Sequence, residues 1–226
     1  MSITKHPTEE TLVAYAAGTL DIGRGIVVAA HVEMCAHCRH WNARLLAVGG
    51  ALLAEAELAP MADDAIHHVL ARLDTEPQPS APSRLASSPA PSSASPHALQ
   101  PLDLLLPKVA RAYEQGTWKW MGPGIHFRPL HVPSSDGARV FLLKAAPGTR
   151  MPHHTHTGTE LTLVLAGAFA HAGGRFGRGD IDDADDTIDH TPVVEAGETC
   201  ICLVAMEGKL QLLGLLGRVL QPFVRL

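Results

Sequence analysis

The chain has 226 residues, with 18 Lys and Arg against 23 Asp and Glu, so its formal net charge is −5. Hydrophobic residues make up 46% of the chain, which excludes wholesale disorder, and the mild acidity argues against direct nucleic-acid binding. No apolar run approaches the ~20 residues of a membrane span, and the first six residues lack the apolar stretch of a signal peptide. Four cysteines favour a reducing cytoplasm over a disulfide scaffold, whereas 14 histidines are unusually many.

A stretch rich in Pro, Ser and Ala divides the chain into two halves. From Pro77 to Pro96, 17 of 20 residues are of these three types, a composition typical of an extended linker. We therefore expect a first domain at 1–76, a linker at 77–100 and a second domain at 101–226. The first domain carries 5 basic and 10 acidic residues, net −5, which suits either a basic protein partner or a solvated acidic surface.

The first 76 residues have the apolar spacing of four helices. Thr8 can cap the first helix, which Gly18 would stop. The second is expected at 23–34 and the third at 36–58, with Gly49 and Gly50 as a weak point. A fourth begins at Asp63 or Asp64. Such a small all-α unit usually needs a metal or a partner to be stable.

The second half shows short apolar runs separated by turn residues. Strands are predicted at 140–143, 161–165, 199–204 and 210–215, and one helix-like segment lies at 102–115. This half is therefore expected to form an all-β barrel or sandwich.

The sharpest motif of the first half is His31-x3-Cys35-x2-Cys38. Its three side chains fall on one face of helical or turn structure, and soft thiolates with imidazole favour a closed tetrahedral zinc site. His6 on the N-terminal arm can fold across as the fourth ligand, whereas His37 and His40 point away from the stripe. The alternative is a pair of buried cysteines with surface histidines.

This constellation resembles the zinc-binding anti-sigma domain, over residues 1–76. The resemblance implies that zinc is held by His6, His31, Cys35 and Cys38, in helices that wrap around an extracytoplasmic-function (ECF) sigma factor. It also implies a sigma-facing helix whose apolar stripe is Ile66, Val69, Leu70 and Leu73. That stripe has a competing interpretation, simple packing on the first three helices.

The second half carries Gly148-x5-His154-x-His156-x3-Glu160-x6-Gly167. His154, His156 and Glu160 share strand parity and converge on a cation site, while His153 points outward. The string resembles the first motif of the cupin superfamily. The second cupin motif is altered, because 177–180 keeps its turn without a Pro. His190 is the favoured fourth ligand and His171 the rival; alternatively, the histidines merely pack.

Two further patterns lie near this motif. The acidic run at 182–186 lacks the Gly and distal Glu of a calcium loop, so it is expected to be a solvated loop. Cys200 and Cys202 are two apart on a strand, with Cα atoms about 6.6 Å apart, near the upper limit for a disulfide. They are either a redox-sensitive pair or ordinary buried cysteines.

A helical zinc domain followed by a cupin-like barrel resembles the ChrR-type anti-sigma factors, as does the C-terminal stretch 214–222. The resemblance implies a cytoplasmic protein with two zinc ions. It would inhibit an ECF sigma factor through the first domain and release it through the barrel on stress by singlet oxygen or organic peroxides. The competing class is a metal-dependent cupin enzyme, a dioxygenase, oxidase or isomerase, with a regulatory helical domain. A DNA-binding helix-turn-helix conflicts with the negative charge of residues 1–76.

Overall fold

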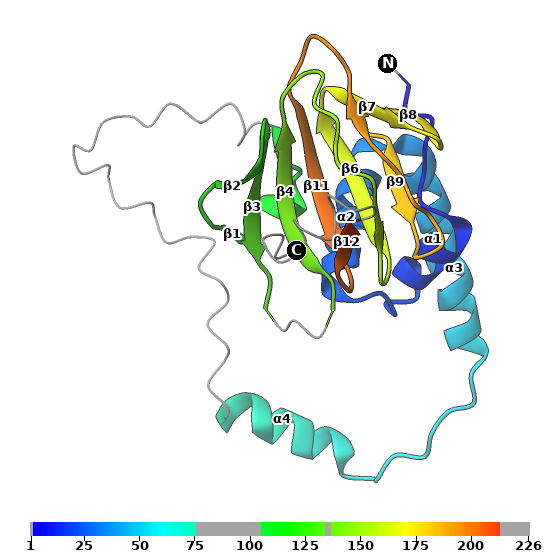
Figure 1. Cartoon of the computed structure of the whole chain (residues 1–226). Coiled ribbons are helices and arrows are strands. Elements are labelled where there is room, and N and C mark those ends of the chain that lie inside the picture. Colours follow the sequence, from blue (N-terminus) through cyan, green and yellow to red (C-terminus); the bar gives the residue numbers. More distant parts are fainter. Residues whose placement is uncertain (1, 76–104, 134–136, 213–226) are drawn as a thin grey trace.

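The structure is a computed structural model that describes residues 2–75, 105–133 and 137–212. The predicted linker at 77–100 and the stretch at 214–222 lie outside these residues. Helices of the N-terminal half lie against one side of a layered β structure (Figure 1). Among the residues described, no helix is both long and apolar enough to span a membrane.

Two of the N-terminal helices begin at capping side chains, of which Thr8 was predicted from the sequence and Asp21 was not. Thr8 accepts a hydrogen bond from the Thr11 amide at 3.2 Å, and Asp21 accepts one from the Arg24 amide at 3.1 Å. These side chains satisfy amide groups that have no partner in the first turn of a helix. The helices of this half are α1 (Glu9–Ala16), α2 (Ile22–Met34), α3 (Ala36–Glu55) and α4 (Ala65–Thr75).

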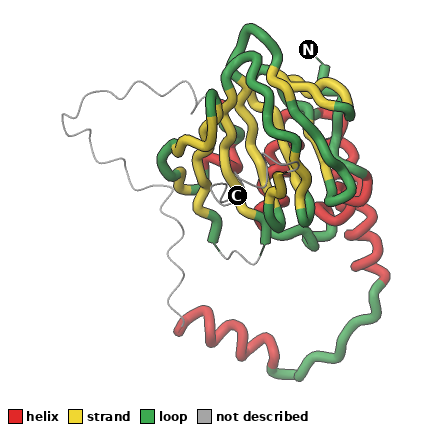
Figure 2. The backbone as a smooth tube through the Cα atoms, viewed as in Figure 1, coloured by secondary structure: helices red, strands yellow, loops and turns green. Residues whose placement is uncertain are grey.

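The expected four-helix unit is not confirmed. Helices α1, α2 and α3 contact one another, but the second half of α3 leaves Leu52 and Leu53 65% and 77% exposed. Helix α4 lies apart from the other three (Figures 1 and 2). Helix α3 also ends at Glu55 rather than at residue 58. The N-terminal half is thus helical without a core shared by all four helices.

The C-terminal half is an antiparallel cupin-like β-sandwich. Its large sheet has the order β1-β3-β4-β11-β6-β9, with β2 paired to β3, and it faces the small sheet β10-β7-β8 and the pair β12-β5. The large sheet comprises β1 (Glu114–Gln115), β2 (Lys119–Gly122), β3 (Ile125–His131), β4 (Arg139–Ala145), β6 (Glu160–Ala166), β9 (Ile181–Ala184) and β11 (Cys200–Met206). The others are β5 (His154–His156), β7 (Ala168–His171), β8 (Gly174–Gly177), β10 (Val193–Val194) and β12 (Leu210–Leu212).

The four predicted strands correspond to β4, β6, β11 and β12. Residues 213–215 of the strand predicted at 210–215 lie outside the described part. The helix-like segment expected at 102–115 does not continue to residue 115, and its residues 102–104 lie outside the described part. The helix described there, α6 (Lys108–Arg111), has four residues, and Glu114 and Gln115 pair with β3 instead. Pro107 starts this short helix, because its ring fits the entry to a helix and not the interior.

The large sheet is buried on both faces, since helix α2 covers the face that points away from the small sheet. Val27 and Val28 of α2 and Leu142 and Leu203 of the sheet are fully buried in one common core. Alternate residues of the same strands form a second core between the sheets, including Phe141, Val164, Cys202 and Val204. Burial on both faces explains why these strands have continuous apolar runs.

Polar contacts reinforce the junction between the halves. Asp21 accepts a hydrogen bond from the Ala138 amide at 3.1 Å. The Glu33 carboxylate accepts bonds from the amides of Lys108 and Val109, at 2.8 and 2.9 Å, and so caps α6 from α2. The helical half and the β-sandwich are therefore joined by direct contacts as well as by the linker.

Candidate metal centres

The first centre, called site 1, brings His6, His31, Cys35 and Cys38 together. His31 lies in the last turn of α2, Cys35 caps α3 and Cys38 lies in its first turn, while His6 comes from the arm before α1. The four ligand atoms all lie within 4.8 Å of one another. The turn between two consecutive helices thus places three of them, and the arm adds the fourth.

The distances in site 1 fit tetrahedral zinc. His31 Nε2 lies 3.3 Å from Cys38 Sγ, and His6 Nδ1 lies 3.5 and 3.4 Å from the sulfurs of Cys35 and Cys38. Zn–S bonds of about 2.3 Å and Zn–N bonds of about 2.0 Å separate neighbouring N and S ligands by about 3.5 Å. The donor set and its spacing therefore suit a closed structural zinc site.

Burial controls the protonation of these ligands. It lowers the pKa of His31 to about 4, so the imidazole is neutral at pH 7 and available to a metal. Burial and the neighbouring Cys35 raise the pKa of Cys38 to about 12. A cation between the two sulfurs offsets that penalty, because it stabilises both thiolates.

His37 lies beside this centre, although the sequence suggested that it points away. Its ring centroid is 4.9 Å from that of His6, but the residue is exposed and is not part of the close group of ligand atoms.

The second centre lies inside the β-sandwich and contains His154, His156 and His190. His154 and His156 are buried on the same side of β5, and the backbone of His190 pairs with that of His154. His190 Nε2 lies 3.0 Å from His154 Nε2 and 3.4 Å from His156 Nε2. Tetrahedral zinc separates two imidazole nitrogens by about 3.4 Å, so the cluster matches the spacing of a metal site.

Glu160 lies at the edge of this cluster. Its Oε2 is 3.5 Å from His156 Nδ1, and its Oε1 accepts a hydrogen bond from Thr162 at 2.9 Å. Burial raises the pKa of Glu160. Its oxygens are not within the close group formed by the three imidazoles, so Glu160 is a neighbour of the cluster and not one of its members.

His171 forms a separate group with Asp182 and His190. His171 Nε2 is 2.8 Å from Asp182 Oδ2, and ligand atoms of all three residues lie within 4.8 Å of one another. His190 is therefore common to both groups, and His171 lies beside the cluster rather than in place of His190.

The acidic run is not simply a solvated loop. Its first part is β9, and Asp182 is 8% exposed against the sandwich interior. No regular alternation of apolar and polar residues marks Ile181–Ala184 as a strand, because the polar Asp182 takes a buried position.

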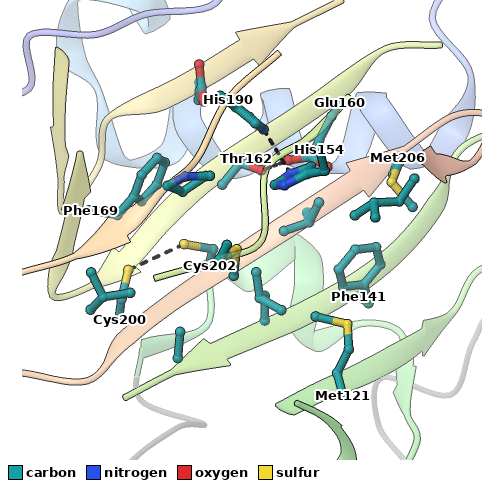
Figure 3. Close-up of a pocket in the computed structure, with 18 residues that line it drawn as sticks. Met121, Phe141, His154, Glu160, Thr162, Phe169, His190, Cys200, Cys202 and Met206 are labelled. Carbon is teal, nitrogen blue, oxygen red and sulfur yellow. Dashed lines mark hydrogen bonds between the residues drawn. The ribbon is translucent and has the colours of Figure 1, made fainter. Parts of the chain in front are cut away.

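A mainly apolar cavity, partly open to solvent, adjoins the histidine cluster (Figure 3). Cys200 and Cys202 project into it from β11, with their sulfurs 3.6 Å apart. Both are free thiols and buried. The hydrogen bond between the Cys202 and Cys200 thiols, together with burial, raises the pKa of Cys202 well above the usual range of a thiol.

The predicted sigma-facing stripe lies on α4. Ile66, Val69, Leu70 and Leu73 are 52–65% exposed. They do not form a buried contact with the first three helices.

Comparisons with known proteins extend over the whole chain. A family described as "ChrR Cupin-like domain" matches residues 107–210. Anti-sigma-E factor ChrR of Cereibacter sphaeroides is 38% identical over 226 residues, covering 100% of both chains. The crystal structure of Rhodobacter sphaeroides SigE in complex with the anti-sigma ChrR matches with a TM-score of 0.68 and 36% identity, covering 91% of this chain and 100% of that one. The chain therefore belongs to the ChrR family of anti-sigma factors.

Proposed function

We propose that this protein inhibits an ECF sigma factor by binding it through the helical half. The observation that carries the proposal is the uncovered apolar surface of α3 and α4, in a chain whose relative is crystallised in complex with SigE. Residues 1–76, proposed as the binding domain, hold all of the net charge of −5, which suits a basic partner. Family membership favours this regulatory role over a cupin enzyme.

The surface has the form of a helix that docks into an apolar groove. On α4 the exposed residues Ile66, Val69, Leu70 and Leu73 follow the spacing i, i+3, i+4, i+7. Leu46, Val48, Leu52 and Leu53 of α3 are 54–77% exposed as well. Contiguous apolar patches on a folded protein usually mark an interface. Binding a sigma factor would cover both helices.

Co-purification with each cellular ECF sigma factor tests this assignment. Leu70→Asp places a charge in the proposed contact and should weaken binding at least ~30-fold, because truncating an interface anchor typically costs 2 kcal/mol or more. His67→Asp adds a similar charge next to the stripe and should have a much smaller effect. Equal binding by wild type and Leu70→Asp would exclude α4 from the interface.

Zinc at site 1 is proposed to hold the helical half in its binding conformation. A closed site in so small a unit contributes its binding free energy to folding. Cys35→Ser should therefore abolish both zinc retention at site 1 and sigma binding, as measured by metal analysis and co-purification. A Cys35→Ser variant that still binds its sigma factor would refute this structural role. The second proposed zinc is held by His154, His156 and His190 with Glu160.

The β-sandwich is proposed to release the sigma factor under oxidative stress. An organic hydroperoxide would oxidise one thiol of the Cys200–Cys202 pair to a sulfenic acid and leave as its alcohol. The second thiol would then form the disulfide and release water. The sulfurs must approach from 3.6 Å to about 2.05 Å. The raised pKa of Cys202 keeps its thiol protonated, so this reaction should be slow at neutral pH.

Release of the sigma factor by cumene hydroperoxide tests the thiol pair. The double variant Cys200→Ser/Cys202→Ser should bind the sigma factor as the wild type does but release it more slowly when oxidised. Identical release curves would show that the pair is not the oxidant-reactive group. A cytoplasmic location is part of the same proposal, since the sigma factor acts on RNA polymerase.

A further inference from the structure

The edge strand of the β-sandwich lies directly against the arm that carries His6. We infer that β9 and the turn before it are part of site 1, with Asp180 and Asp183 positioning the zinc ligands of the helical half. This inference rests on the zinc binding proposed above, but it does not depend on which sigma factor is bound.

Asp180 holds the arm on the N-terminal side of His6. Its Oδ1 accepts hydrogen bonds from the amides of Thr4, at 2.7 Å, and Lys5, at 3.0 Å. Its Oδ2 accepts a hydrogen bond from the Gly177 amide at 2.9 Å, and this bond fixes the carboxylate in the turn. Asp180 is 5% exposed. A buried carboxylate has no water to donate hydrogen bonds to it, and these amides take that place. The arm is therefore held by charge-assisted hydrogen bonds.

Asp183 holds the arm on the other side of His6. Its Oδ2 accepts hydrogen bonds from the Thr8 amide at 3.0 Å and from the Thr11 hydroxyl at 2.8 Å. Between the two aspartates, the Ile181 amide donates to the Lys5 carbonyl at 3.3 Å. Since residues on both sides of His6 are bonded to the same strand, its imidazole has little freedom to leave the site.

The same turn orients the second imidazole. The Gly179 carbonyl lies 2.9 Å from His31 Nδ1, and a carbonyl can only accept, so Nδ1 carries the proton. The other nitrogen, Nε2, then faces Cys38 Sγ with its lone pair available to a metal. Outer hydrogen bonds of this kind fix the tautomer and ring orientation of a metal-binding histidine. Gly179 has φ +90°, and a Cβ there would meet Ile3 at 2.6 Å, so the turn is shaped to accept the arm.

The opposite face of β9 reaches the second centre. Asp182, between Ile181 and Asp183, points inward and contacts His171, which groups with His190. One strand of four residues therefore contacts the surroundings of both centres. This gives a direct route between the two halves that does not pass through the linker.

The experiment uses the full chain loaded with Co²⁺. Sulfur-to-cobalt charge-transfer absorption reports site 1 alone, because the ligands proposed for the sandwich centre are nitrogen and oxygen. Loss of this absorption is followed after addition of excess chelator to wild type, Asp180→Asn and Asp183→Asn. Asp185→Asn is the matched control, since within the described ranges the Asp185 carboxylate accepts hydrogen bonds from Thr187 in its own turn and none from the arm. The cobalt that remains in the sandwich centre checks that each variant is folded.

We expect site 1 to lose cobalt on the order of tenfold faster in Asp180→Asn and Asp183→Asn, the effect of weakening charge-assisted hydrogen bonds. Asp185→Asn should match the wild type. If Asp180→Asn and Asp183→Asn both lose cobalt from site 1 at the wild-type rate, the inference is overturned, while zinc binding at site 1 is left intact. A wild type without sulfur-to-cobalt absorption would instead refute site 1 itself. If Asp180→Asn fails to fold, Asp183→Asn decides, because the Asp183 carboxylate is half-buried and accepts its hydrogen bonds from Thr8 and Thr11.

Discussion

At the scale of single residues, two glycines of α2 distinguish close packing from helix propensity. A Cβ on Gly23 would meet the Ala138 carbonyl oxygen at 2.4 Å, whereas a Cβ on Gly25 would have nothing within 4 Å. Gly23→Ala should lower the free energy of unfolding by about 1–3 kcal/mol through overpacking. Gly25→Ala should raise it by about 0.5–1 kcal/mol, since Ala favours the helix. Urea denaturation of both variants measures this, and equal changes would contradict the close approach of α2 to the sheet.

Asp21 contributes stability that depends on pH. Burial alone would raise its pKa, but hydrogen bonds from Arg24 and the Ala138 amide lower it below the ordinary value. The folded state therefore favours the charged form, and its contribution is present above the unfolded pKa and lost as pH falls below about 4.

Asp21→Asn should lower the free energy of unfolding by about 1 kcal/mol at pH 7, the value of a partly screened charged hydrogen bond. The difference from wild type should shrink as the pH falls below about 4, since the carboxylate is then protonated in both states. Denaturation curves at several pH values measure it. A difference that stayed constant with pH would show that the charge of Asp21 is not the cause.

At the scale of elements, the sequence of β11 predicts a strand but does not predict which elements pack against its two faces. Its sequence Cys200–Met206 is continuously apolar, so it lacks the alternation that would have told which face is solvent-exposed. In the structure neither face is exposed, because Leu203 packs towards α2 while Val204 faces the cavity. The helix that covers this sheet lies in the other half of the chain, which no local pattern could reveal.

Leu203→Ala should therefore be costly. Leu203 is fully buried between the sheet and α2, so truncation should lower the free energy of unfolding by about 2–5 kcal/mol. Leu46→Ala removes the same atoms from α3, where the side chain is 54% exposed. This substitution should change the free energy of unfolding by less than about 0.5 kcal/mol. Urea denaturation compares the two. A small effect at Leu203 would mean that α2 does not cover the sheet.

At the scale of the whole molecule, the helical half and the sandwich share one core. Val27 and Val28 of α2 belong to the same buried cluster as Leu142, Leu163 and Leu203. We therefore expect helical circular dichroism and the near-ultraviolet signal of the sandwich to be lost in a single transition with one midpoint on heating. Two separated midpoints would show that the halves fold independently.

The sequence by itself determined the local order of this protein and which residue types gather in its candidate metal sites. Cap residues set the starts of α1 and α2, and the spacing of His31, Cys35 and Cys38 put three ligands at one helix turn, because these features depend on near neighbours in the chain. Strands β4, β6, β11 and β12 were likewise recognisable from their apolar runs, whereas the other strands of the sandwich were not.

Only the tertiary structure decided which distant residues meet. It brought Asp180 and Asp183 to the arm of His6, set Asp182 beside His171 and His190, and left α4 uncovered. Contacts between residues about 175 positions apart are fixed by how a helix packs on a sheet, and that packing depends on the shape of both surfaces together. A period along one segment carries no information about it.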